Sequence, residues 1–159
     1  MSDKRLTLTA EEEAWEKEWV KQFNIANDTL DASSWERFFL PNATSRYGNN
    51  PERHGWPEIR DAFTRVLSFL SWMDHKLLHS TFVPSEGVTY HTCIISYKVK
   101  GDESGEQFDI PALGVITKEL GSQEWRMSRF QLYNDLSPVL LRVREVMTKQ
   151  AAATAAAKE

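Results

Sequence analysis

The side chains that could do acid–base chemistry in this chain are a few carboxylates, imidazoles and phenols. Asp31 begins a predicted short helix, His79 lies in a strand-like stretch, and Tyr47 precedes a Gly-Asn-Asn turn. A carboxylate that accepts a hydrogen bond from one imidazole nitrogen fixes the tautomer and makes the other nitrogen a better base. A phenol can donate a hydrogen bond to a carbonyl oxygen as an enolate forms. The alternatives are a helix cap for Asp31, an ordinary strand residue for His79 and a rim residue for Tyr47.

Further candidates lie on the strands predicted in the second half of the chain. Asp109 points either inward, where burial would raise its pKa, or outward as a solvated charge. In the strand over residues 88–100, alternation gives two faces, and the more apolar one is expected to point inward. That face carries His91, Cys93, Ile95, Tyr97 and Val99. Tyr97 is then a ligand-binding group or proton donor, and Cys93 a small buried hydrophobe.

Two polar residues and several aromatic ones complete the set of candidate ligand-binding residues. Gln131, on the last predicted strand, could orient a ligand, and Arg37 either pairs with nearby acids or binds an anionic or carbonyl group. Large apolar side chains are expected to shape a pocket and exclude water. They are Trp35, Phe39, Trp56, Phe63 and Leu67.

The sequence favours no metal or cofactor. His54 and His75 fit no constellation, and a site built from Asp31, His75 and His79 would lack the helical spacing of a zinc enzyme. The chain has no nucleophile elbow, phosphate-binding loop or dinucleotide glycine pattern.

Composition narrows the class of protein. The 159 residues carry a net charge of −4 and no basic stripe, which argues against nucleic acid as a partner. Cys93 is the only cysteine, so no intramolecular disulfide or cysteine zinc cluster can form, and a reducing compartment is favoured. No apolar run approaches a membrane span, and the first residues lack the apolar stretch of a secretory signal. We therefore expect a soluble cytoplasmic protein with no membrane partner.

The hydrophobic periodicity changes along the chain from helical to alternating. A capping box at Thr9 and Glu12 opens a helix over residues 9–27, a short helix from residue 31 or 33 ends before Pro41, and a third runs from Pro57 to about Met73. A short strand is possible over 43–47. Longer strands are predicted over 75–83, 88–100, 107–119 and 124–133, and a last helix over 137–148.

This order of elements predicts an α+β domain over residues 1–149, in which a curved antiparallel sheet packs on three N-terminal helices and a C-terminal helix follows. The Ala-rich residues 150–159 form either an extension of that helix or a solvated tail. A sheet that curls around the third helix would leave a deep pocket. Its other face carries enough apolar side chains to predict a homodimer.

The order of elements resembles the nuclear-transport-factor-2-like cone fold, and within it scytalone dehydratase, ketosteroid isomerase and the SnoaL-like polyketide cyclases. Residues 30–37, continuing to Tyr47, are similar to the dehydratase segment that runs from an aspartate to a pocket tyrosine. Residues 131–138 are similar to the last strand and exit of polyketide-cyclase-like domains. The resemblance covers about residues 9–146.

The resemblance implies that Asp31 and His79 form a hydrogen-bonded pair in the pocket, that Tyr47 polarises a carbonyl group, and that Tyr97 lies near a second catalytic position. The expected activity is dehydration, isomerisation or cyclisation of a polyketide- or terpenoid-like molecule without a metal or cofactor. The alternatives are a non-catalytic binding or dimerisation module and, more remotely, an epoxide-opening hydrolase that uses Asp109 and Arg129.

Overall fold

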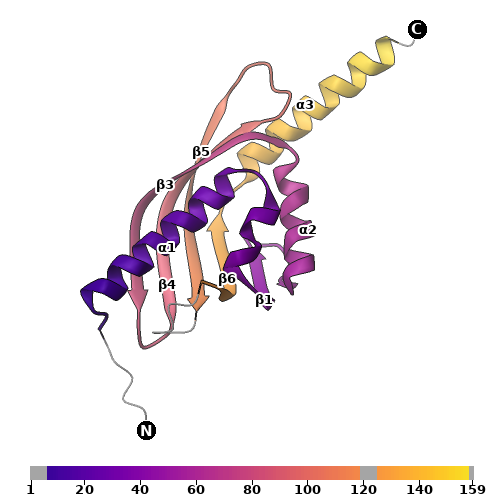
Figure 1. Ribbon diagram of the computed structural model, residues 1–159. Helices are drawn as coiled ribbons and strands as arrows, with labels where there is room; N and C mark the ends of the chain where they lie inside the picture. Colours follow the sequence, from indigo (N-terminus) through magenta and orange to yellow (C-terminus); the bar gives the residue numbers. More distant parts are fainter. Residues whose placement is uncertain (1–6, 119–124, 158–159) are drawn as a thin grey trace.

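The computed structural model describes residues 7–118 and 125–157 (Figure 1). Within these residues four helical segments and six strands follow one another in an α+β order. In chain order they are α1 (Ala10–Asp28), the 3-10 helix η1 (Ala32–Phe38), β1 (Phe39–Tyr47), β2 (Arg53–His54), α2 (Trp56–Leu67), β3 (Leu70–Val83), β4 (Val88–Val99), β5 (Gln107–Lys118), β6 (Met127–Asn134) and α3 (Ser137–Ala156).

The six strands form one sheet in the order β2-β1-β6-β5-β4-β3. Most neighbours are antiparallel, as expected, but β1 runs parallel to β6. A parallel pair needs a long connection, and these two strands are joined through β2, α2 and the three long strands. The predicted curved antiparallel sheet is therefore confirmed, with this one parallel pairing as a difference.

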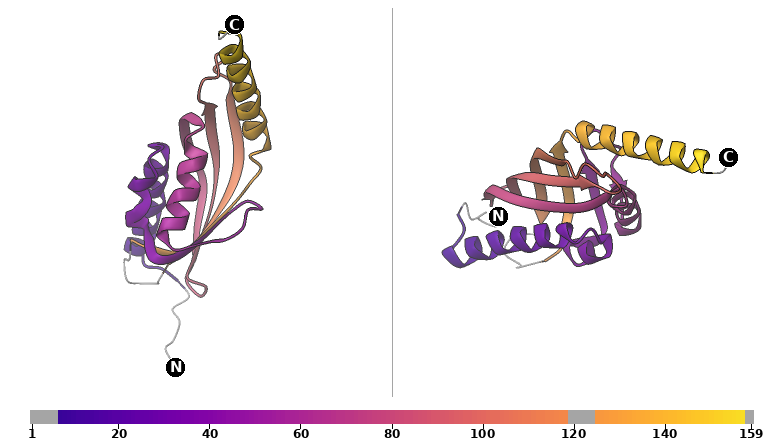
Figure 2. Two further views of the ribbon diagram at one scale, coloured as in Figure 1. Left: turned by 90° about the vertical axis from the view of Figure 1, so that its right-hand side faces the viewer. Right: turned by 90° about the horizontal axis from the view of Figure 1, so that it is seen from above.

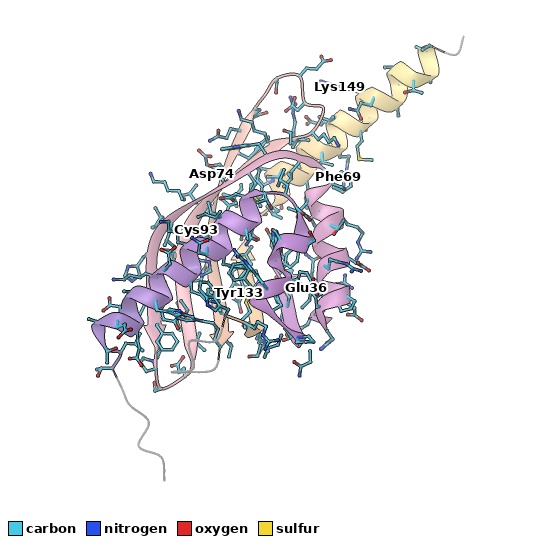
Figure 3. All side chains as sticks on the ribbon, viewed as in Figure 1. Glu36, Phe69, Asp74, Cys93, Tyr133 and Lys149 are labelled. Atoms are coloured by element: carbon cyan, nitrogen blue, oxygen red, sulfur yellow. The ribbon has the colours of Figure 1, made fainter. Side chains whose placement is uncertain are left out.

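The sheet separates two helical layers (Figure 2). The first layer, α1, η1 and α2, covers one face of the sheet, which we call the inner face. α3 lies on the opposite side, at one end, and continues beyond the strands. Side chains fill the space between the first layer and the sheet (Figure 3). The centre of this core is an aromatic cluster around Phe23. The ring centroids of Trp19, Phe38 and Phe130 each lie 5.3–5.4 Å from the ring centroid of Phe23, and those of Trp19 and Phe38 lie 5.3 Å apart.

The predicted start of α1 is confirmed. Thr9 Oγ1 accepts a hydrogen bond from the backbone N of Glu12 at 3.3 Å, and Glu12 Oε2 accepts one from the backbone N of Thr9 at 2.8 Å. These bonds satisfy two N–H groups that a helix start otherwise leaves unpaired. The helix then runs to Asp28, so this carboxylate lies on its last turn.

The boundary between α2 and β3 differs from the prediction. α2 ends at Leu67 and β3 begins at Leu70, about five residues before the expected strand, because Leu70 pairs with Val99 and opens a long antiparallel ladder with β4. Long-range pairing therefore overrides the helical spacing of residues 68–73. β1 also starts earlier, at Phe39, and α3 extends through Ala156, which makes residues 150–156 helical. Residues 119–124, which hold the predicted end of one strand, the break after it and the predicted start of the next strand, lie outside the described part of the chain. Among the described helices none is long and apolar enough to cross a membrane.

Candidate active site

A small enclosed chamber lies between the first helical layer and the inner face of the sheet. Its volume is about 30 Å³, which is space for one or two water molecules and far less than a drug-sized ligand occupies. The deep pocket predicted from the sequence is thus nearly filled by side chains. They belong to Phe23, Asn24, Asn27, Trp35, Tyr47, Phe63, Val66, Leu67, Leu70, Met73, His75, His91, Cys93, Tyr97, Phe130 and Leu132.

Five of the predicted site residues line this chamber: Trp35, Tyr47, Phe63, Leu67 and Tyr97. Phe39 and Trp56, which were also expected to shape the pocket, do not line it and pack against each other in the core. The inward face predicted for β4 is confirmed, since all five of its residues are buried. Tyr47 Oη lies 3.3 Å from Tyr97 Oη, and Asn134 Nδ2 donates to Tyr47 Oη at 3.5 Å. Burial raises the pKa of both phenols, so both stay protonated and can donate hydrogen bonds.

The structure does not bring Asp31 and His79 together. Asp31 is exposed and caps η1, where its Oδ1 accepts hydrogen bonds from Ser33 N at 2.9 Å and Ser33 Oγ at 2.7 Å. Both bonds hold the pKa of Asp31 below its usual value, and the bond from the Ser33 side chain has the larger effect. The helix-cap alternative is therefore the one that the structure bears out.

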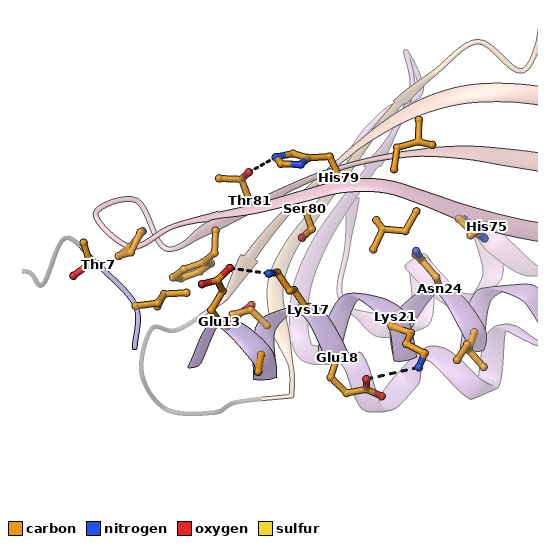
Figure 4. A pocket seen from close by; sticks show the side chains of 18 of the residues that line it. Thr7, Glu13, Lys17, Glu18, Lys21, Asn24, His75, His79, Ser80 and Thr81 are labelled. Atoms are coloured by element: carbon orange, nitrogen blue, oxygen red, sulfur yellow. Dashed lines mark hydrogen bonds and ion pairs between the residues drawn. The ribbon is translucent and has the colours of Figure 1, made fainter. Parts of the chain in front are cut away.

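His79 faces away from the chamber. Its Nε2 lies 2.6 Å from Thr81 Oγ1, and both side chains lie on the side of β3 that is turned away from α1 (Figure 4). The register explains this placement, because His79 pairs with Thr92, which is on the outer face of β4, after an irregularity in the ladder between Leu77 and His79. The one-residue slip changes which side chains face the helix.

A different carboxylate and imidazole form the expected kind of pair. Asp28 Oδ1 lies 2.6 Å from His75 Nδ1, and Asp28 Oδ2 accepts a hydrogen bond from the backbone N of His75 at 3.2 Å. The His75 side chain is 9% exposed and that of Asp28 is 23% exposed. With Nδ1 held as the donor, Nε2 of His75 is the nitrogen left to accept a proton. Sequence reasoning placed His75 next to Asp74 and gave it no partner.

His91 and Asn24 bring two further polar groups to the chamber. Among the described residues, neither His91 Nδ1 nor Asn24 Nδ2 has a hydrogen-bond partner, although both atoms are buried. Burial, and the charge of His75 to a lesser extent, lowers the pKa of His91 to about 4. The imidazole is therefore neutral near pH 7. Burial also raises the pKa of Cys93 to about 11, which keeps this side chain a thiol, as the sequence predicted.

This pKa of His91 predicts an acid-sensitive contribution to stability. The pKa of about 4 in the folded protein lies below the ordinary value of 6.5, so the unfolded chain binds the proton more tightly than the folded one. The stability that the neutral imidazole contributes is therefore fully present above pH 6.5 and is lost as the pH falls through 4. Between about pH 7 and about pH 4 we expect the wild type to lose on the order of 3 kcal/mol more stability than His91→Gln. Urea unfolding of both proteins across this range measures the difference. Parallel curves of stability against pH for the two proteins would contradict the prediction.

The other three predicted ligand-binding residues lie outside the chamber. Asp109 is exposed and accepts hydrogen bonds from Ser96 Oγ at 2.7 Å and Gln107 Nε2 at 2.8 Å, which keep its pKa below the usual value. Gln131 is on the outer face of β6, and Arg37 lies over the ring of Phe38, 4.7 Å from its centroid. The inward positions of β5 are instead Ile110, Ala112, Gly114, Ile116 and Lys118.

The epoxide-hydrolase alternative gains nothing from these positions. Arg129 is also exposed, and it pairs with Glu52 at 2.9 Å rather than with Asp109. Among the described residues no group of three or more histidine, cysteine, aspartate and glutamate side chains could hold a metal ion.

Two open spaces border the chamber and share residues with it. A groove of about 1200 Å³ between α1 and β3 shares Asn24 and His75 with the chamber, and Asp28 lines only the groove (Figure 4). A pocket of about 210 Å³, lined by β1 and α2, shares Tyr47, Phe63 and Val66. The carboxylate–imidazole pair thus stands at one border of the chamber, and one of the two tyrosines stands at another.

Comparison with known proteins supports the fold. No protein-family model and no curated protein matches the sequence. A protein from Jannaschia assigned as a SnoaL-like polyketide cyclase is 13% identical, with a TM-score of 0.66 over 80% of this chain and 90% of that one. A protein from Shewanella putrefaciens with a similar assignment is 16% identical, with a TM-score of 0.62 over 87% of this chain and 96% of that one. A steroid delta-isomerase from Pseudomonas aeruginosa is 18% identical, with a TM-score of 0.54 over 96% of this chain and 99% of that one.

The chain therefore has a nuclear-transport-factor-2-like cone fold, as its sequence predicted. The similar structures include SnoaL-like polyketide cyclases and a steroid isomerase, which is the branch that the sequence resembles. At these identities the likeness establishes the fold, and the chemistry has to be argued from the chamber itself.

Proposed function

We propose that this protein is an acid–base isomerase, cyclase or dehydratase that acts, without a cofactor, on a carbonyl compound of polyketide or terpenoid type. The observation that carries the proposal is that His75, which Asp28 holds through its Nδ1, and the Tyr47–Tyr97 pair line one chamber. One pair can move a proton, and the other can donate hydrogen bonds to an oxygen on which negative charge develops.

The reaction would begin at a carbon next to the carbonyl group. His75 Nε2 takes a proton from that carbon, the electron pair moves to the carbonyl oxygen, and the hydroxyl groups of Tyr47 and Tyr97 stabilise the enolate. In isomerisation the enolate takes the proton back from His75 at another carbon. In dehydration it expels a hydroxyl group, which leaves as water with the proton from His75. In cyclisation it attacks a second carbonyl carbon of the substrate, whose oxygen takes that proton. Asp28 orients the imidazole and stabilises its protonated form.

The size of the chamber requires that side chains move when a substrate binds. Phe63 and Val66 line both the chamber and the 210 Å³ pocket beside it, so a shift of these two side chains would join the spaces. The joined space would accept a small ring. Its buried, largely apolar walls would strengthen the hydrogen bonds to the enolate by keeping water away.

Proton exchange tests the proposal without knowledge of the natural substrate. We would incubate the protein with cyclic ketones, including the β,γ-unsaturated 3-cyclohexenone, in D₂O and follow deuterium incorporation and conjugation of the double bond by NMR. The wild type should catalyse both. Tyr97→Phe should lower the rate about a hundredfold, the usual effect of losing an enolate-stabilising donor.

Tyr133→Phe is the matched control, since this tyrosine is 51% exposed on the outer face of β6 and should not affect the rate. Ketone binding without exchange would instead favour the non-catalytic binding module. A rate equal to that of buffer with every ketone of the panel would overturn the proposal.

We also propose that two copies associate through the outer face of the sheet. The strand register places Tyr90, Leu113, Val115 and Tyr133 together on this face, and Tyr90 and Tyr133 are 37% and 51% exposed. Leu113→Arg should convert a dimer to a monomer in sedimentation velocity. Ile25→Arg, which changes an exposed residue of α1 on the opposite side of the sheet, should leave the dimer intact. A monomeric wild type would contradict this proposal.

A further inference from the structure

Asn24 and His91 are polar, buried and unused by the chemistry described above. Asn24 is 5% exposed and His91 is 2% exposed, and both residues line the chamber. Asn24 Nδ2 and His91 Nδ1 have no hydrogen-bond partner among the described residues. Leaving such groups unpaired costs about 1–3 kcal/mol each, so a fold that keeps two of them at one small chamber suggests that they serve a ligand.

The position of the His91 ring is built into the sheet. His91 pairs with Gly114 across β4 and β5, and the imidazole lies directly against this glycine. A methyl group at position 114 would overlap the ring atoms Cε1 and Nε2. The absence of a side chain at this position on β5 therefore reserves the space that the imidazole fills.

The charges around the chamber indicate what kind of group would fit. Burial keeps His91 neutral, so its ring offers one donor and one acceptor, and Asn24 Nδ2 offers a donor. The Asp28 carboxylate lies close enough to raise the pKa of Cys93, so its negative charge is felt in the chamber and opposes an anionic ligand. An ammonium group has no acceptor for the Asn24 amide. A hydroxyl group can both accept and donate.

We propose that Asn24 and His91 form a binding subsite for a hydroxyl group of the ligand. The hydroxyl oxygen accepts a hydrogen bond from Asn24 Nδ2, and the hydroxyl hydrogen is donated to His91 Nδ1. A chamber of about 30 Å³ has room for a group of this size. The proposed function places a carbonyl group of the substrate at Tyr47 and Tyr97. Together with that carbonyl group, and so resting on the proposed function, the hydroxyl subsite defines the substrate as a hydroxy ketone.

Two small probes separate the hydroxyl subsite from the carbonyl site. NMR titrations would measure the binding of cyclohexanol and of cyclohexanone to the wild type, Asn24→Leu and Tyr97→Phe. We expect Asn24→Leu to weaken cyclohexanol binding about fivefold, the value of one hydrogen bond, and to leave cyclohexanone binding unchanged. Tyr97→Phe should have the reverse effect. Leucine is close to asparagine in size, and since Asn24 Nδ2 has no partner among the described residues, we expect Asn24→Leu to fold.

A second measurement requires no variant. The ¹⁵N chemical shift of Nδ1 in the His91 ring should change when cyclohexanol saturates the wild type, because a hydrogen bond forms at this atom, and it should not change with cyclohexanone. This reading holds even if Asn24→Leu does not fold.

Each result separates the two proposals. If Tyr97→Phe rather than Asn24→Leu weakens cyclohexanol binding, the tyrosines hold the hydroxyl group and the subsite is refuted. If cyclohexanol does not bind, or binds without changing the His91 signal, the subsite is likewise refuted. If the binding of cyclohexanol changes as expected but Tyr97→Phe leaves the binding of cyclohexanone unchanged, the hydroxyl subsite is supported and the carbonyl site of the proposed function is refuted.

Discussion

Replacing His75 by glutamine should lower the rate of ketone proton exchange by a factor of about 10² to 10⁴, which is the usual contribution of a general base. The side chain is 9% exposed, and its Nδ1 is held 2.6 Å from Asp28, so in this proposal only Nε2 can receive the proton. Glutamine keeps polar atoms at this position but cannot take up a proton near neutral pH. Deuterium incorporation into 3-cyclohexenone, followed by NMR, gives the rate.

His79→Gln is the matched control because His79 is also on β3 but faces away from the chamber. Its exchange rate should equal that of the wild type. If His79→Gln were the slow variant and His75→Gln the normal one, the proton would be moved by the residue that the sequence resemblance favoured, and the Asp28–His75 assignment would be wrong.

Replacing Glu16 by glutamine should lower the free energy of unfolding by about 3–5 kcal/mol. Glu16 accepts hydrogen bonds from Lys118 Nζ at 2.8 Å and 2.7 Å, and the lysine side chain is 2% exposed. The ammonium also lies 4.3 Å from the ring centroid of Trp15 and 4.6 Å from that of Trp19. Without the carboxylate, a buried positive charge at the end of β5 loses its counter-ion, and burial already lowers the pKa of Lys118.

Urea unfolding at neutral pH measures this loss, and Glu13→Gln provides the comparison. Glu13 pairs with Lys17 at 2.7 Å on the same helix, but both side chains are more than half exposed, so we expect a change below about 0.5 kcal/mol. The double variant Glu16→Gln with Lys118→Met should recover much of the stability, since it removes the unpaired charge. Equal losses in the free energy of unfolding for Glu16→Gln and Glu13→Gln would show that the buried Glu16–Lys118 pair stabilises the fold no more than the exposed Glu13–Lys17 pair.

The sequence predicts this fold well where the information is local. The capping box of Thr9 and Glu12 marks the start of α1, and strict alternation along β4 identifies the inward face that carries Tyr97. In both cases the pattern of a few neighbouring residues determines the outcome. Tyr47, which lines the chamber, was expected in the pocket from the resemblance of residues 30–47 and not from such a local pattern.

The carboxylate–imidazole pair could not be located in this way. Its position depends on where β3 begins and on the irregularity before His79, and both are set by pairing with β4, a strand that lies later in the chain. Asp28 and His75 are separated by 47 positions in sequence, and no local pattern joins them. The direction of Asp109 is of the same kind, because one position along β5 decides between the inner and the outer face.

The contact of the His91 ring with Gly114 has an evolutionary consequence. The two residues share one volume, so a change at either position constrains the other. A side chain at position 114 would require the imidazole at 91 to move or to be replaced. The presence of both glycine and histidine at this pair of sites would therefore distinguish relatives that keep the proposed hydroxyl subsite from those that share only the fold.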